Sequence, residues 1–268
     1  MSRYADYHDL KVTVEDRVAT VTINRPEARN TINQRLIREL RTIWDDLADD
    51  PKVHAVLLTG AGNVFSLGGD VKAMSERPGG DVLEEGEVHD PMVMRRLVNR
   101  LLELDKPIVC AVNGDCIGLA ATIALLCDVT VMNEDARIGD THVSRVGLVA
   151  GDGGTVIWPL LIGVNKAKEY LMRGTLLKGR EAERIGLVNH VAPAGEVMAR
   201  AAAIAHELAH GPTWATRWTK LSINQVIKDR ANHLMEASMA LEQVTFTLPD
   251  HKEATTSFKE KRKPKFGG

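Results

Sequence analysis

Two glycine-rich segments each follow an apolar strand pattern and lead into a helical pattern, and their backbones could bind an oxyanion. The first segment is GAGNVFSLGGD at 60–70, and the second is NGDCIGLAAT at 113–122. The first turn of a helix has unpaired N–H donors and a partial positive charge, so two such ends facing each other can hold an oxyanion between backbone amides. Tight turns are the alternative interpretation of either segment.

Neither segment matches the common phosphate-binding motifs. GAGNVF lacks the third glycine of the dinucleotide fingerprint, and no strand is followed by GxxxxGK[ST]. A third glycine-rich segment, GDGGT at 151–155, also precedes a helical pattern, but no acid follows at the distance of a ribose-binding residue. The sequence therefore argues against a Rossmann dehydrogenase.

The elements around these segments alternate between strand and helix patterns. Residues 18–23 alternate apolar and polar side chains, as in a strand with one buried face, and apolar residues at 36–47 have the spacing of a helix. Further strands are expected at 55–60, 107–112, 128–132 and 187–191, and further helices at 92–104 and 117–126. This alternation predicts an α/β fold.

Strand patterns stop near residue 195, which divides the chain into an α/β core over 1–195 and a helical region over 196–268. Three or four helices are expected between 196 and 259, with breaks at Pro212 and Pro249. Acidic residues without periodicity at 75–90 predict a loop.

Composition excludes several classes of function. The 34 Lys and Arg residues nearly balance the 36 Asp and Glu residues, giving a net charge of -2 and no basic field for nucleic acid. Neither a signal peptide nor an apolar stretch of about 20 residues is present, so no membrane role is expected.

Three cysteines lie inside apolar runs, which argues against disulfides and predicts a reducing compartment, the cytoplasm; they are Cys110, Cys116 and Cys127. Cys116 and Cys127 are expected to be core thiols. The histidines have no ligand-like spacing with acids or cysteines, so no metal is expected; they include His89, His190, His206 and His210.

Taken in order, the motifs resemble the enoyl-CoA hydratase/isomerase (crotonase) superfamily across almost the whole chain. They are INRPEARNTI (23–32), LLTGAGNVFSLGGDVKAM (57–74), KPIVCAVNGDCIGLAATIALLCDV (106–129), GLVAGDGGT (147–155), AERIGLVNHV (182–191) and FKEKRKPKF (258–266). The resemblance implies a crotonase-like spiral of ββα units and a helical C-terminal region used in trimerisation. It also implies an acyl-CoA thioester substrate, with CoA as part of the substrate and no separate cofactor.

The resemblance assigns the oxyanion donors to the backbone N–H groups of Gly69 and Leu119. Each donor aimed at a thioester enolate oxygen contributes about 3 to 4 kcal/mol by analogy with other oxyanion holes. Leu119 stands where the family often has glycine, but a backbone donor does not depend on the side chain.

Other residues inherit roles in CoA binding and assembly from the resemblance. Ala28, Ser66 and Leu67 align with segments whose backbone meets the pantetheine and adenine of CoA. Lys263, in the basic run at 259–265, aligns with a stretch near the CoA 3'-phosphate and a neighbouring subunit. The apolar residues at 221–241 are too many for a peripheral appendage, and the resemblance implies a homotrimer or a dimer of trimers.

The sequence departs from the family at both catalytic glutamates of its hydratases. Thr122 occupies the first position, and a threonine hydroxyl can orient a water but cannot exchange a proton near neutral pH. The second position matches His142 or Val143, depending on the alignment, so neither position supplies a carboxylate.

His142 is the expected replacement, because an imidazole has an ordinary pKa of about 6.5 and is suited to proton transfer. Its orienting partner is Asp152, ten residues on, or alternatively Asp140. The β-diketone hydrolases of the superfamily use a His and an Asp from this region with similar spacing.

Three functions therefore remain open. The first is an acyl-CoA enzyme of the hydratase/isomerase type, with hydration, isomerisation, decarboxylation and C–C cleavage all compatible with a thioester enolate. The second is a retro-Claisen hydrolase of β-diketones that uses His142 and Asp152. The third is a non-catalytic acyl-CoA binding protein that has lost its acids.

Overall fold

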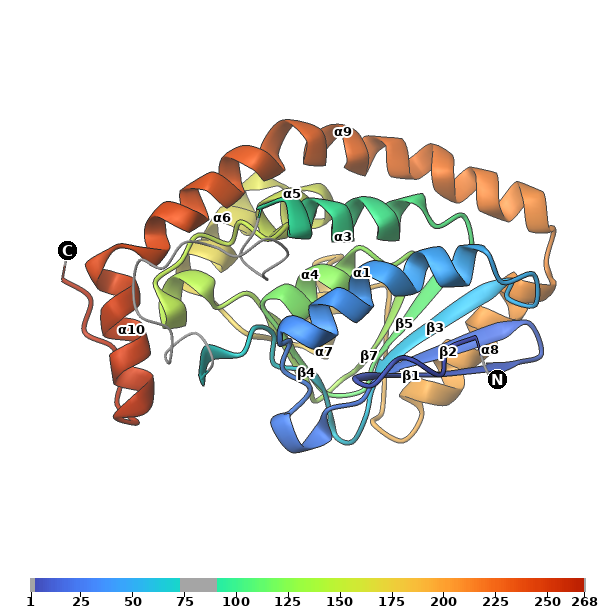
Figure 1. Cartoon of the computed structure of the whole chain (residues 1–268), viewed down its shortest axis with the longest axis horizontal. Coiled ribbons are helices and arrows are strands. Elements are labelled where there is room, and N and C mark those ends of the chain that lie inside the picture. Colours follow the sequence, from blue (N-terminus) through green and yellow to red (C-terminus); the bar gives the residue numbers. More distant parts are fainter. Residues whose placement is uncertain (1–2, 73–90, 268) are drawn as a thin grey trace.

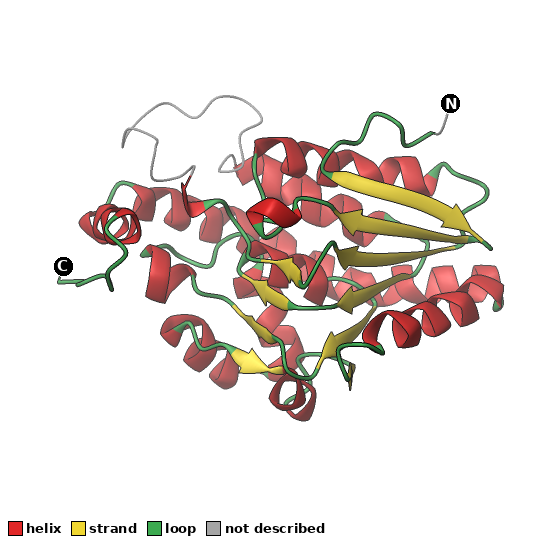
Figure 2. Cartoon of the chain, turned by 90° about the horizontal axis from the view of Figure 1, so that it is seen from below, coloured by secondary structure: helices red, strands yellow, loops and turns green. Residues whose placement is uncertain are grey.

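The computed structural model describes residues 3–72 and 91–267, and their strands form two sheets. The larger has six strands in the order β1-β2-β3-β5-β7-β10, and the smaller has four in the order β4-β6-β8-β9 (Figure 2). The strands of the larger sheet are β1 (Leu10–Glu15), β2 (Val18–Ile23), β3 (Ala55–Gly60), β5 (Ile108–Val112), β7 (Val129–Asn133) and β10 (His190–Ala192). Those of the smaller sheet are β4 (Val64–Ser66), β6 (Asp115–Ile117), β8 (Arg137–Gly139) and β9 (Leu177–Lys178).

Helices cover both faces of the larger sheet, which explains why β3 and β5 are buried at every residue. On one face, the core includes the apolar stripe of α1 (Gln34–Ala48) and residues of α3 (Pro91–Glu103). On the other face, alanines of α8 (Val197–His210) pack against Leu57 and Val109. The α8 alanines in this contact are Ala201, Ala205 and Ala209.

Successive strands alternate between the two sheets, so each strand pair and its helix make one turn of a spiral. β3 and β4 form the first such pair, β5 and β6 the second, and β7 and β8 the third. The larger sheet is parallel from β2 to β10, with β1 antiparallel at its edge. The predicted spiral of ββα units is confirmed.

The chain beyond residue 195 contains three described helices, α8, α9 (Thr213–Phe246) and α10 (Pro249–Lys259). Pro212 and Pro249 separate them, as predicted. The 34 residues of α9 run over α3 and α5 (Gly154–Ile162), with α10 at the far end (Figure 1). The other helices in the described residues are α4 (Leu119–Leu125), α6 (Val164–Arg173), α7 (Gly179–Arg184), a 3-10 turn η1 (Pro26–Ala28) and a π-helical turn η2 (His142–Val146).

The helix predicted at 117–126 begins later than expected, at Leu119, because the apolar residues before it belong to β6. β6 pairs with β4 and β8, contacts that local periodicity does not reveal. The loop predicted at 75–90 falls outside the described residues. None of the helices in the described part of the chain is long and apolar enough to cross a membrane.

Candidate active site

A buried asparagine holds the first glycine-rich segment in place by hydrogen bonds. Asn30 has a left-handed backbone (φ 55°) and is fully buried. Its side-chain amide donates to three carbonyl oxygens at 2.9 to 3.1 Å, those of Ala61, Val64 and Phe65. Ser66 donates its hydroxyl to the Asn30 carbonyl at 2.6 Å and accepts from the Gly68 N–H at 3.2 Å. The segment before Gly69 is therefore held by the Asn30 side chain from outside it and by the Ser66 hydroxyl within it.

The backbone N–H of Gly69 is directed away from the strand that anchors it. Ile32 forms an isolated parallel bridge with Gly69, in which the Ile32 N–H donates to Gly68 and the Asp70 N–H donates to Ile32. A parallel bridge uses the residues on either side of the bridged one, so the N–H of Gly69 itself points to the opposite side.

The second glycine-rich segment packs against Gly68, the residue before Gly69. Leu119 is the first residue of α4, where helical N–H groups have no partner within the helix. The two segments are in close contact, since a Cβ atom on Gly68 would lie 2.4 Å from the Ile117 carbonyl oxygen and 3.5 Å from the Leu119 nitrogen. The structure therefore brings the segments of both predicted oxyanion donors together.

His142, at the start of η2, lies beside this second segment. A Cβ atom on Gly118 would lie 3.5 Å from the Cε1 atom of the His142 ring. The Asp140 Oδ1 atom accepts from the backbone N–H of His142 at 2.9 Å and lies 2.7 Å from its ring Nδ1. The ring Nε2 atom lies 3.6 Å from Asp152 Oδ2. Both expected partners thus contact the ring, with Asp140 as the hydrogen-bonded one.

Thr122 and Asp152 are also joined at this site. The Thr122 hydroxyl, on α4, donates to Asp152 Oδ1 at 3.3 Å, and both residues are buried. A carboxylate therefore stands next to the position where the hydratases of the family carry their first glutamate. Val143, the other match for the second glutamate, is an apolar residue with 38% of its surface exposed.

Sequence reasoning missed one residue of this cluster, Glu242 on α9. It is 5% exposed, and a Cβ atom on Gly151 would lie 2.6 Å from its Oε2 atom, so it packs against the loop that carries Asp152. The sequence feature that could have identified Glu242 is its position as a single acid on the same helical stripe as the buried residues Met235, Ser238 and Met239.

Three buried carboxyl groups and the partly buried His142 ring shift one another's pKa values. Burial alone lowers the pKa of His142, but the carboxylates of Asp140 and Asp152 outweigh it and raise that pKa well above its ordinary value. Burial raises the pKa of Asp140, and the opposing charge of His142 reverses this and lowers it. Burial, with the Asp140 charge, raises the pKa of Asp152, and burial raises that of Glu242 to about 8. An imidazolium among carboxylates of different basicity suits proton transfer.

The predicted CoA-binding residues are only partly brought together. Ala28 lies in η1, and the Leu67 N–H donates to the neighbouring Arg29 carbonyl at 3.4 Å, so these backbones adjoin. The Ser66 side chain points inward to Asn30 rather than to solvent. Lys263 is exposed in the tail beyond α10, and Figure 1 shows the C-terminus apart from β4, which belongs to the first glycine-rich segment.

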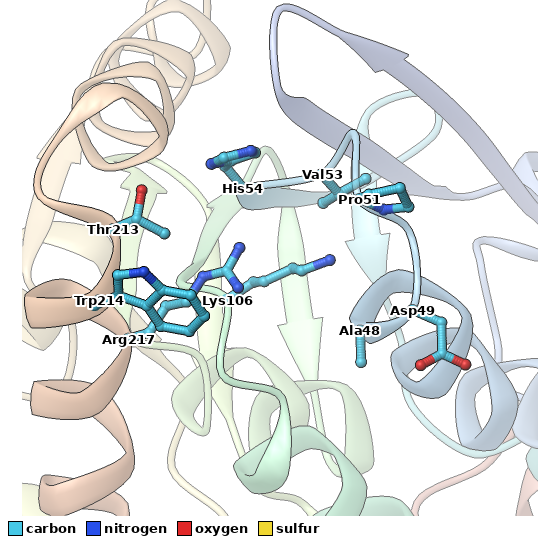
Figure 3. Close-up of a pocket in the computed structure, with 9 residues that line it drawn as sticks. All are labelled: Ala48, Asp49, Pro51, Val53, His54, Lys106, Thr213, Trp214 and Arg217. Carbon is cyan, nitrogen blue, oxygen red and sulfur yellow. The ribbon is translucent and has the colours of Figure 1, made fainter.

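A pocket of about 450 Å³ lies at the end of the larger sheet where the central strands β3 and β5 begin (Figure 3). None of the predicted site residues lines it. Its lining residues are Ala48, Asp49, Pro51, Val53, His54, Lys106, Thr213, Trp214 and Arg217. Lys106 donates to the carbonyls of Leu47 and Asp50 at 2.5 and 2.7 Å, and Arg217 pairs with Asp105 at 3.1 Å, so these cations hold the fold together.

Two groups of potential metal ligands occur among the described residues. One is Asp140, His142 and Asp152 in the buried cluster. The other is a surface group, in which Asp16 lies 3.2 Å from both His206 and His210. The expectation that these two histidines lack an acid at ligand spacing is corrected here, since the tertiary structure supplies it from the β1–β2 turn. Cys116 and Cys127 are buried thiols, as predicted, and Cys110 is buried as well.

Comparison with known proteins identifies the family to which this chain belongs. The family model for enoyl-CoA hydratase/isomerase matches residues 13–268. The chain belongs to the enoyl-CoA hydratase/isomerase family. The chain is 34% identical over 250 residues to the short-chain-enoyl-CoA hydratase of Clostridium acetobutylicum, covering 93% of this chain and 94% of that protein. It is 30% identical over 262 residues to the crotonyl-CoA hydratase of Syntrophomonas wolfei, covering 97% and 98%.

Solved structures of the family agree with this placement. An enoyl-CoA hydratase/isomerase from Mycobacterium paratuberculosis superimposes with a TM-score of 0.86 at 32% identity, over 93% of this chain and 98% of that one. These matches show the crotonase fold over almost the whole chain.

Proposed function

We propose that the chain is an acyl-CoA-processing enzyme that adds water to an enoyl-CoA double bond with His142 and Asp152 in place of the two usual glutamates. The observation that carries this proposal is that the His142 ring lies beside Gly118, in the second oxyanion segment, with its Nε2 atom 3.6 Å from Asp152 Oδ2. The hydratases among its relatives supply the substrate class.

In the proposed reaction, the N–H groups of Gly69 and Leu119 bind the thioester carbonyl oxygen and stabilise the enolate. Asp152, oriented by the Thr122 hydroxyl, takes a proton from water as the oxygen attacks the β-carbon. The imidazolium of His142 donates its Nε2 proton to the α-carbon, while Asp140 holds Nδ1. The proton on Asp152 then returns to His142, which restores both groups and leaves a net addition of one water.

Turnover of crotonyl-CoA, followed at the enone absorbance, tests this proposal. We expect the wild type to hydrate crotonyl-CoA, and His142→Ala and Asp152→Asn each to lose roughly 10²- to 10⁴-fold in kcat. His190→Ala is the control, because His190 lies in β10 at the edge of the larger sheet and should leave turnover unchanged. A wild type that binds crotonyl-CoA without turning it over would refute the hydratase proposal.

The same cluster supports a second function, retro-Claisen cleavage of a β-diketone. The supporting observation is that His142, a partly buried candidate base, contacts the buried Asp140 and Asp152, as a His/Asp pair that activates water for attack on a carbonyl would require. Release of a ring-opened acid from a cyclic β-diketone, without hydration of crotonyl-CoA, would favour this function. Tight CoA binding with neither activity would indicate a non-catalytic binding protein.

We also propose that the enzyme acts as a homotrimer or a dimer of trimers in the cytoplasm. Several apolar side chains of α9 are more than 40% exposed, as expected for a surface that other subunits cover; they are Ile223, Val226, Leu234 and Leu241. A neighbouring subunit would bring Lys263 to the CoA phosphates, and three unpaired buried cysteines suit a reducing compartment.

A further inference from the structure

The C-terminal end of α8 carries a sequence pattern that the proposed function does not use. Residues 206–210 read His-Glu-Leu-Ala-His, with two histidines four residues apart on one helix. This spacing places both imidazoles on the same helical face and is a zinc-binding pattern. The two rings lie nearly parallel, with centroids 5.8 Å apart and 9° between their planes.

A carboxylate from a distant part of the sequence meets these two rings. Asp16 and Arg17 form the two-residue turn between β1 and β2, both with left-handed backbones (φ 42° and 68°). Such a turn suits the twist of a hairpin and fixes the direction of the Asp16 side chain. Its Oδ2 atom lies 3.2 Å from His206 Nδ1, and its Oδ1 atom lies 3.2 Å from His210 Nε2.

Hydrogen bonding orients one of the rings for metal binding. His210 Nδ1 lies 2.9 Å from the carbonyl oxygen of His206 and can donate its hydrogen there. In the neutral ring this leaves the lone pair on Nε2, which faces a carboxylate oxygen of Asp16. Two lone pairs in contact repel each other, so this arrangement needs a cation between them, either a second proton on the ring or a metal ion. Metal-bound histidines commonly hydrogen-bond through their other nitrogen in this way.

We propose that Asp16, His206 and His210 bind one divalent transition-metal ion of the zinc class, which links the β1–β2 turn to the end of α8. Their ligand atoms all lie within 4.8 Å of one another. Two imidazoles and one carboxylate favour zinc over magnesium or calcium, which prefer oxygen ligands. The side chains are 43 to 59% exposed, so water completes the coordination. Because the ion stays open to solvent, the site binds metal without the water-excluded cavity that hydrolysis requires.

Titration of the full-length protein with zinc chloride, by calorimetry or equilibrium dialysis, tests the site. We expect one zinc ion per chain, and a loss of affinity of roughly tenfold or more in His206→Ala, His210→Ala and Asp16→Asn. All three residues are exposed, so these substitutions should leave the fold intact. Zinc should also raise the Tm of the wild type, because binding to the native state alone stabilises it.

His233→Ala is the matched control. His233 is an exposed helical histidine whose Nδ1 atom lies 3.5 Å from Asp229 and which has no second histidine four residues away in the sequence. Its removal should leave zinc affinity and the rise in Tm unchanged. The proposal is overturned if zinc does not bind saturably, if His206→Ala and His210→Ala bind it like the wild type, or if His142→Ala alone abolishes binding, which would place the ion in the buried cluster.

Discussion

Replacing Gly68 with alanine tests whether contact between the two glycine-rich segments creates the oxyanion site. Gly68 has a left-handed backbone (φ 77°), and an added Cβ atom would lie 2.4 Å from the Ile117 carbonyl oxygen. Ordinary carbon contacts are about 3.5 Å or longer, so the segments must separate by about 1 Å. A displacement of that size can cost on the order of 10²-fold in rate. Loss of one oxyanion donor costs about 10²- to 10³-fold in kcat.

Gly62→Ala is the matched control for backbone strain. Gly62 lies in the same segment with a similar left-handed backbone (φ 74°), but its added Cβ would meet only the Pro26 Cβ atom, at 3.6 Å. Both variants should lose about 1 to 2 kcal/mol of stability from the left-handed alanine. Gly68→Ala should lose more, because it also carries the clash with Ile117.

Steady-state hydration of crotonyl-CoA and urea unfolding separate these effects. We expect Gly62→Ala to keep its kcat, and Gly68→Ala to remain folded with kcat reduced about 100-fold or more. A folded Gly68→Ala protein whose kcat stays within about threefold of the wild type would refute the assignment of catalysis to this contact.

Four further predictions follow from the site and the surface. Asp140→Asn should lower the pKa of His142 by removing the charge that raises it, so the alkaline limb of the kcat/KM profile should move to lower pH. Glu242 has its pKa raised to about 8, so its contribution to stability is present below its unfolded pKa and is lost as pH rises through 8. Urea unfolding should therefore show Glu242→Gln gaining stability relative to the wild type above pH 8. Asn30→Ala should lose about 3 kcal/mol of stability, because three buried carbonyls lose their donor. Light scattering should give three or six times the chain mass, and a monomer at micromolar concentration would contradict the assembly.

Much of the larger sheet could be predicted from local patterns. The strands expected at 18–23 and 55–60 coincide with β2 and β3, because alternating or continuous apolar residues bounded by turns are strong local signals. The short strands β4, β6, β8 and β9 were missed. They have two or three residues each and depend on pairing with one another, which no local pattern encodes.

The candidate site likewise combines features that the local sequence predicts with contacts that only the fold creates. The sequence identified His142 and left its partner open between Asp140 and Asp152; the structure places Asp140 Oδ1 2.7 Å from Nδ1 and Asp152 Oδ2 3.6 Å from Nε2. The sequence alone gave no reason to connect Glu242 with the loop that carries Asp152, about 90 residues earlier in the chain. That contact exists because α9 folds back over the start of α5.

By itself, the sequence determined the family, the α/β class and the chemical types at the site, since these depend on residue identity and on short-range periodicity. Only the tertiary structure decided which groups share a buried environment: Asp140 with His142, Glu242 beside Asp152, and Asp16 against His206 and His210. The physical reason is that protonation and ligand binding depend on distances and burial across the fold, and residues far apart in the chain set both.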